Sequence, residues 1–358
     1  MMPYGYTNMY FKDASVLKNV LHNLGDFLYQ PIPLTPIDGI DVTIIVDNFI
    51  SSLLPNNPPV NRISSIKNIK SNVTEDAMVK DRLKAEHGFS AWVSIDKGKN
   101  THNLMFDTGV SPTGAIENLE RLGINPKNAE MIVLSHGHYD HTLGLDGLLR
   151  KLRFTSMPLI LHPEFWNKRR IVIPGRRPTE IPSISRTSLV EGGFEIIQES
   201  RQPSFLLEDS VLITGEIDRT TTFENGFPGQ EAFIEYSWQP DPLTLDDQAL
   251  IVNIKNKGLV ILTGCGHSGI INLAKYAQKL TGIKKIHALI GGFHLPDSPH
   301  FLKIIPETIK NIKHLSVDWI VPTHCTGLEA LSKFSQEFPE SFIQNSVGSK
   351  YTFNNDIH

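Results

Sequence analysis

The stretch LSHGHYDHTLG, from Leu134 to Gly144, contains three histidines and one aspartate within six residues. The apolar run AEMIVL (129–134) leads into it and is typical of a β-strand, whereas LGLDGLLRKL (143–152) has the apolar spacing of a helix. The ligand-type side chains therefore lie on a loop between a strand and a helix, where they can converge without disturbing the core.

The spacing within this loop divides its polar side chains into two pairs. His136 and His138 are two residues apart, so in an extended segment they point to the same side. They can bind one cation through neutral imidazole, whereas Asp140 and His141, where the helix begins, face toward a second cation. A chance run of polar loop residues is the alternative, but this density of ligand types after a β-strand favours a metal site.

Further ligand-type residues occur in the second half of the chain, each just after an apolar run. They are Cys265 and His267 in TGCGHSG, His294 in GGFH and His324 in PTHCTG. Because loops of this kind gather at one edge of a sheet, we expect these side chains to lie near the first cluster. For Cys265 two interpretations stay open, a metal-binding thiolate or an ordinary buried cysteine.

Both halves of the chain have the same order of elements, with strands first and strand–helix units after them. In the first half, β-type runs occupy 40–48, 88–96 and 102–109, and a helical pattern occupies 113–124. The second half repeats this order from residue 248 onward. The pattern predicts an α/β protein in which two sheets pack together and helices cover them.

Composition divides the chain into three parts. Residues 1–39 form an N-terminal extension with one amphipathic helical pattern at 15–24, and residues 40–358 form the catalytic fold. Within that fold, the region 165–247 is rich in proline, glycine, serine and arginine, which is typical of loops. We interpret this region as an insertion that covers the site like a lid.

Bulk composition excludes several classes of protein. The chain has 358 residues, of which 40% are hydrophobic and 20% charged, as in an ordinary soluble protein. A formal net charge of −4 gives no general attraction to nucleic acid, and no window approaches the roughly 18 apolar residues of a membrane span. With only two cysteines and no secretory signal, a cytoplasmic location is the default expectation. The oligomeric state is not determined by the sequence.

The motifs resemble those of one known superfamily. HGHYDH (136–141) matches the His-x-His-x-Asp-His signature of the metallo-β-lactamase superfamily, and FDTG (106–109) matches its upstream motif. A wider set, including AEHGFS, TGCGHSG, GGFHL and PTHCTG, is similar to the branch of 7,8-dihydropterin-6-methyl-4-(β-D-ribofuranosyl)aminobenzene-5′-phosphate synthase. The resemblance covers roughly residues 40–353. It implies an αβ/βα four-layer sandwich, with two mixed β-sheets and helices on the outer faces.

The resemblance also implies a cofactor. It points to two divalent metal ions, with zinc favoured and iron or manganese as alternatives. Asp107 of FDTG would support the metal loop. The residues at the positions of metal ligands are His136, His138, Asp140, His141, His267, His324 and, if it acts as a thiolate, Cys265.

This sequence departs from the common pattern of the superfamily. Many members have a third histidine before the strand that ends in TGD, but here only His162 lies in a comparable place, and we interpret it as structural. Cys265 replaces the TGD aspartate, which is normally a bridging ligand. His267, two residues on, is predicted to take the role of the third histidine. Cys325 is interpreted as a packing residue.

A metal pair of this kind lowers the pKa of bound water and polarises the bond under attack. Asp140 would hold the second metal and orient the water, and His294 would donate a proton to a leaving oxygen. The branch implies condensation of a dihydropterin pyrophosphate with a ribosylaminobenzene phosphate and loss of pyrophosphate. Two alternatives stay open: a general hydrolase of phosphodiesters or lactones, and an inactive member that binds a ligand.

The substrate is expected to be a phosphorylated small molecule. NKRR (167–170) and PGRRP (174–178) bring several cations together, and the guanidinium groups of Arg176 and Arg177 suit phosphate oxygens. A solvated basic loop is the alternative interpretation. Glu216 and Arg219, in GEIDRTTTFE, are also predicted to contact substrate.

Overall fold

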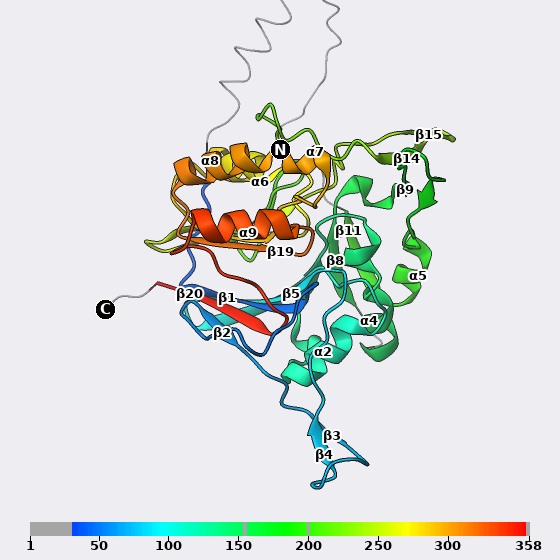
Figure 1. Cartoon of the computed structure of the whole chain (residues 1–358), viewed down its shortest axis with the longest axis vertical. Helices are drawn as coiled ribbons and strands as arrows, with labels where there is room; N and C mark the ends of the chain where they lie inside the picture. Colours follow the sequence, from blue (N-terminus) through cyan, green and yellow to red (C-terminus); the bar gives the residue numbers. More distant parts are fainter. Residues whose placement is uncertain (1–30, 153–155, 199–200, 356–358) are drawn as a thin grey trace, which may run out of the picture.

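Two mixed β-sheets packed face to face form the centre of the protein, and helices cover their outer faces (Figure 1). The computed structural model describes residues 31–152, 156–198 and 201–355. The architecture confirms the predicted αβ/βα four-layer sandwich. The helix expected at 15–24 lies outside the described residues.

The first sheet has eight strands and is built mainly from the first half of the chain. Its antiparallel part surrounds β1, and its parallel part continues from β6 to β11. In spatial order the strands are β11 (Phe194–Gln198), β8 (Met157–Leu161), β7 (Met131–Val133), β6 (Asn100–Phe106), β5 (Ser90–Lys97), β1 (Gly39–Val46), β20 (Ser349–Asn354) and β2 (Val60–Arg62).

The second sheet has six strands and is built from residues between 204 and 323. β17, β18 and β19 run parallel, and the others are antiparallel. In spatial order they are β12 (Ser204–Leu206), β13 (Val211–Ile213), β16 (Ala249–Ile254), β17 (Gly258–Thr263), β18 (Ile286–Gly292) and β19 (Trp319–Thr323).

Helices complete the outer layers, because each sheet has a second apolar face to bury. The longer helices are α2 (Gly114–Leu122), α4 (Leu145–Leu152) and α5 (Arg186–Glu191) on the first sheet, and α6 (Ile270–Thr281), α8 (Ile305–Leu315) and α9 (Leu328–Glu337) on the second (Figure 1). Two short helices, α3 (Tyr139–Thr142) and α7 (Pro299–Leu302), lie in loops.

Strand β16 shows how the layers arise from the sequence. Successive side chains of a strand point to opposite faces. Leu250 and Val252 therefore lie in the core between the two sheets. Ala249 and Ile251 lie in the core under the second set of helices. All four residues are buried, which explains why this run is apolar throughout and not alternating.

The region 165–247 divides into two structural parts. Its α5 and the strands β11, β12 and β13 belong to the main layers. Four other strands of the region form a separate sheet, which we call the insertion sheet. It consists of β10 (Thr179–Glu180), β9 (Arg169–Ile171), β14 (Gln230–Ile234) and β15 (Ser237–Pro240), in this spatial order.

Two peripheral segments complete the described chain. Residues 31–38, which the sequence placed in the N-terminal extension, bond to the sandwich: the Thr35 amide donates to the Asp209 carbonyl, and Ile37 forms a bridge with Ile254. The hairpin of β3 (Asn68–Lys70) and β4 (Met78–Lys80) projects from the body (Figure 1). No helix in the described part of the chain is both long and apolar enough to span a bilayer.

Candidate metal centre

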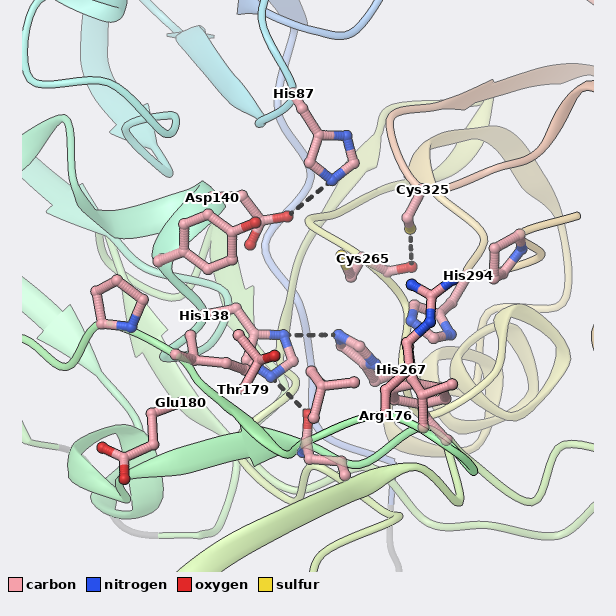
Figure 2. Close-up of a pocket in the computed structure, with 18 of the residues that line it drawn as sticks. His87, His138, Asp140, Arg176, Thr179, Glu180, Cys265, His267, His294 and Cys325 are labelled. Atoms are coloured by element: carbon pink, nitrogen blue, oxygen red, sulfur yellow. Dashed lines mark hydrogen bonds and ion pairs between the residues drawn. The ribbon is translucent and has the colours of Figure 1, made fainter. Parts of the chain in front are cut away.

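The predicted ligands meet at one edge of the sandwich, where strands of both sheets end. The loop after β7 carries His136, His138 and Asp140, the loop after β17 carries Cys265 and His267, and the residues after β19 begin with His324. All of them are buried, with at most 8% of the residue surface exposed. Figure 2 shows His138, Asp140, Cys265 and His267 among the side chains that line one pocket.

Three imidazoles form the first group. His138 Nδ1 lies 2.9 Å from His136 Nε2 and 3.1 Å from His267 Nε2. In a tetrahedral zinc site with Zn–N distances of about 2.0 Å, neighbouring nitrogens lie roughly 3.3 Å apart. Both distances from His138 Nδ1 are close to this value, so the three imidazoles could hold one cation together.

Hydrogen bonds on the outer side of these rings show which nitrogens hold lone pairs. Ser135 Oγ donates to the Asp107 carboxylate at 2.7 Å, so it accepts from His136 Nδ1, 2.9 Å away. His138 Nε2 donates to Gln230 Oε1 at 2.7 Å. A neutral imidazole has one N–H, so the facing nitrogens of His136 and His138 both carry lone pairs. Two lone pairs at 2.9 Å repel each other unless a cation lies between them, which fits a resident metal ion.

The second group contains His141 and His324. His141 Nδ1 donates to Asp107 Oδ2 at 2.7 Å, which directs its Nε2 lone pair toward Cys265 Sγ at 3.2 Å. His324 Nδ1 lies 3.2 Å from Asn48 Oδ1, and its Nε2 lies 3.3 Å from Asp140 Oδ2. A carboxylate or amide oxygen behind a ligating histidine fixes its tautomer, as in known metal sites.

Cys265 belongs to both groups. Its sulfur lies within 4.8 Å of the ligand atoms of His136 and His267, and within the same distance of those of His141 and His324. The residue is buried, with 3% of its surface exposed. A thiolate there would be shared by two cations, which is the position of a bridging ligand.

Burial and charge determine the protonation of these groups. Burial lowers the pKa of His136, His138 and His267, to about 4 for His138, so all three are neutral at pH 7 and able to bind metal. Burial opposes protonation of His324 as well, but the Asp140 carboxylate outweighs it and raises the pKa to about 9. At Asp140, burial is outweighed by His141 and His324, which lower its pKa.

Four of the candidate ligands, His138, Asp140, Cys265 and His267, line a cavity of about 610 Å³. Its apolar lining includes Ile171 of β9, Ile173 between β9 and β10, Ile181 after β10, and Phe227. Arg176 and Arg177 also line this cavity, and both are exposed. No ion pair of either side chain is found within the described residues.

Two further histidines flank the centre. His294 is half-buried, its ring centroid lies 4.0 Å from that of His267, and burial together with His138 lowers its pKa to about 3. His87 Nε2 lies 3.7 Å from Asp140 Oδ2, and both histidines line the cavity (Figure 2). The sequence pointed to His294, whereas the position of His87 was visible only in the similarity of AEHGFS.

Two arginines of the basic segment 167–170 pair with carboxylates. Arg169, grouped with the basic cluster, is buried and pairs with Asp246 and Asp241. Arg170 pairs with Glu231 at 2.6 Å.

Glu216 and Arg219 do not line the cavity. Arg219 donates to the carbonyl oxygens of His267 and Ser268, so it supports the backbone of the metal loop instead of a ligand. Glu216 pairs with Arg201. His162, the weak alternative ligand, accepts from the Glu164 amide and begins a turn, in agreement with its structural interpretation.

Three residues that contact the ligand loops were not predicted from the sequence: Asp246, Asp247 and Gln230. Asp246 accepts from the Gly137 amide at 2.8 Å, and Asp247 accepts from the Ser268 amide at 2.8 Å. Gln230 contacts His138, as described above. Asp246 and Asp247 stand next to each other just before an apolar strand, and this pattern could have identified them as candidates. Nothing in the local sequence distinguishes Gln230 from other polar residues.

Comparison with known proteins identifies the family of this chain. A family model of the metallo-β-lactamase superfamily matches residues 87–220. A 7,8-dihydropterin-6-methyl-4-(β-D-ribofuranosyl)-aminobenzene-5′-phosphate synthase from Methanocaldococcus jannaschii is 31% identical over 274 residues, which cover 75% of this chain and 90% of that protein. An uncharacterized protein of the same organism is 34% identical over 268 residues, which cover 74% of this chain and 92% of that protein.

Among solved structures, a metal-dependent hydrolase of the β-lactamase superfamily superposes with a TM-score of 0.64 at 22% identity, covering 88% of this chain and all of that one. This likeness supports the fold. The family model and the sequence relatives show that the chain belongs to the metallo-β-lactamase superfamily, in the branch that contains the dihydropterin-ribofuranosylaminobenzene-phosphate synthase.

Proposed function

We propose that this protein is a metal-dependent enzyme that acts on a phosphorylated small molecule related to pterins. The observation that carries the proposal is the position of Cys265 between two groups of inward-facing imidazoles. The Cys265 sulfur and the surrounding imidazole nitrogens form a set of metal donors that suits zinc, with iron or manganese as alternatives.

Each group has a distinct role in this proposal. His136, His138 and His267 would hold one cation, and Asp140, His141 and His324 would hold the other. Cys265 would be shared by both. Bound cations of this kind act as Lewis acids and lower the pKa of bound water. Asp107, behind His141, keeps that ring oriented.

The cavity supports a substrate with an apolar ring and an anionic group. Isoleucine side chains and Phe227 form a wall against which a flat ring can lie, and Arg176 and Arg177 can bind phosphate oxygens. His294, beside His267, is neutral and can donate its one N–H to an oxygen of the substrate.

The relative named as a synthase suggests the reaction. In it, an arylamine nitrogen of a ribosylaminobenzene phosphate would form a bond to the methylene carbon of a dihydropterin pyrophosphate. The carbon–oxygen bond to pyrophosphate would break, and the amine would lose a proton.

The test combines metal analysis with a product assay. We expect about two equivalents of divalent metal per chain, and release of pyrophosphate only when both dihydropterin pyrophosphate and the arylamine are present. Less than one equivalent of metal would contradict the metal-dependent function. Turnover of chromogenic phosphodiesters or lactones without pyrophosphate release would instead identify a general hydrolase.

A further inference from the structure

The insertion sheet contacts the metal loop directly. Gln230, the first residue of β14, accepts from His138 Nε2 at 2.7 Å, although the two residues are 92 positions apart. Arg169, the first residue of β9, pairs with Asp246, which also accepts from the Gly137 amide between two of the ligands. The wall of the cavity and the first metal group therefore share one hydrogen-bond network.

The orientation of the Gln230 amide is determined by its other partners. Its Nε2 donates to Thr244 Oγ1 at 2.9 Å and to the carbonyl and carboxylate of Asp241, each at 3.1 Å. The opposite oxygen is left as the acceptor toward His138, and the residue is fully buried. This oxygen can accept a proton but cannot donate one, so it selects the His138 tautomer with its N–H on Nε2.

We propose that Gln230 is a positioning residue that keeps the Nδ1 lone pair of His138 directed at the first cation, so that metal affinity depends on the insertion sheet. The inference rests on the proposed metal centre but not on the proposed substrate. Without an acceptor beside Nε2, the imidazole proton is free to move to Nδ1, where it blocks the ligand position. Loss of such a partner behind a ligating histidine typically weakens metal affinity by about 10- to 100-fold.

The test compares three variants for zinc affinity, measured by competition with a chromophoric chelator. Gln230→Met keeps the size of the side chain but removes the acceptor, and we expect about 10- to 100-fold weaker binding of one of the two ions. Gln230→Glu keeps an acceptor oxygen beside His138 Nε2, while its second oxygen, when protonated, can donate to Asp241 in place of the amide. Zinc affinity in this variant should stay within a few fold of the wild type. Glu231→Gln is the matched control, because it removes the Arg170 partner from the next position of the same strand.

A spectroscopic measurement separates positioning from a general structural role. In metal-free protein, nitrogen-15 NMR of the histidine rings should show His138 protonated at Nε2 in the wild type and a shift toward Nδ1 in Gln230→Met.

Unchanged zinc affinity or an unchanged tautomer in folded Gln230→Met would overturn the inference. Equal loss of affinity in Glu231→Gln would also overturn it, because the effect would then come from the sheet as a whole. A wild type that binds zinc with these variant effects but makes no pterin product would leave the inference standing and refute only the proposed reaction.

Discussion

At the level of single side chains, the chain's two cysteines have different surroundings within one site. Cys265 Sγ lies within 4.8 Å of ligand atoms of both histidine groups. Cys325 Sγ instead donates to the Cys265 carbonyl oxygen at 3.2 Å, the contact drawn as a dashed line in Figure 2. A cysteine that supports backbone can be replaced by serine at little cost, because serine keeps a donor. A shared ligand cannot, since a neutral hydroxyl is a poor metal ligand compared with a thiolate.

This difference gives a paired prediction. Cys265→Ser should reduce bound zinc from about two equivalents to one or fewer, whereas Cys325→Ser should retain both, as measured by elemental analysis after gel filtration. Cys265→Asp should recover the second ion, because the carboxylate again offers two oxygens to share. Full metal content in Cys265→Ser would show that the sulfur is not a ligand.

At the level of elements, the insertion sheet is attached to the sandwich by a buried ion pair. Arg169 Nη2 lies 2.6 Å from Asp246 Oδ1, and Arg169 Nε lies 2.8 Å from Asp241 Oδ2, with the arginine 2% exposed. Removing one partner leaves buried carboxylates without compensation, which costs about 3–5 kcal/mol.

We therefore expect Arg169→Met to lower the free energy of unfolding by about 3–5 kcal/mol in urea titrations. Arg150→Met serves as the control, because its pair with Asp146 is exposed and lies within one helix. Such surface pairs contribute about 0.3–0.5 kcal/mol. Similar losses in the two variants would mean that the Arg169 network does not stabilise the fold through burial.

The loop between β9 and β10 leads to another prediction, because it carries Arg176 and Arg177 at the cavity. Replacing both by alanine should reduce the thermal stabilisation given by dihydropterin pyrophosphate, since each charge-assisted contact contributes about 1.5–3 kcal/mol. Metal content should stay unchanged. Arg186→Ala, in α5 and outside the cavity lining, is the control. An undiminished shift in the double variant would assign the arginines to a solvated loop.

For the whole molecule, metal removal should change how stability depends on pH. His138 and His294 have pKa values of about 4 and about 3, below the ordinary 6.5. As pH falls below 6.5, the unfolded chain takes up protons that the folded chain does not, so stability is lost. His324, with a pKa of about 9, acts in the opposite direction: its contribution is complete below 6.5 and is lost as pH rises toward 9.

Metal-free protein should thus have its highest melting temperature near pH 6.5, measured by scanning fluorimetry from pH 4 to 9. Zinc should abolish the alkaline decline, because it takes the place of the proton on His324. Asp140→Asn should also abolish it in metal-free protein, since the carboxylate is what raises that pKa. A metal-free melting temperature that rises steadily from pH 6.5 to 9 would contradict this assignment.

The amino-acid sequence by itself determined the elements and the ligand types. Periodicities of two and of 3.6 residues depend only on near neighbours, so the strands of both halves and the loop from Leu134 to Gly144 could be predicted. The position of ligand-type residues just after strands also predicted that His136, His267 and His324 would meet, because such loops share one edge.

Only the tertiary structure decided what each side chain faces. Arg169 and Arg176 belong to one basic segment, yet Arg169 is buried against Asp246, 77 positions away, and Arg176 lines the cavity. Gln230 lies beside His138, and Cys265 lies between two histidine groups, through contacts that span about a hundred residues. A local sequence pattern gives the type and spacing of side chains but not their contacts. The direction in which a side chain points depends on packing between segments that are far apart in the sequence.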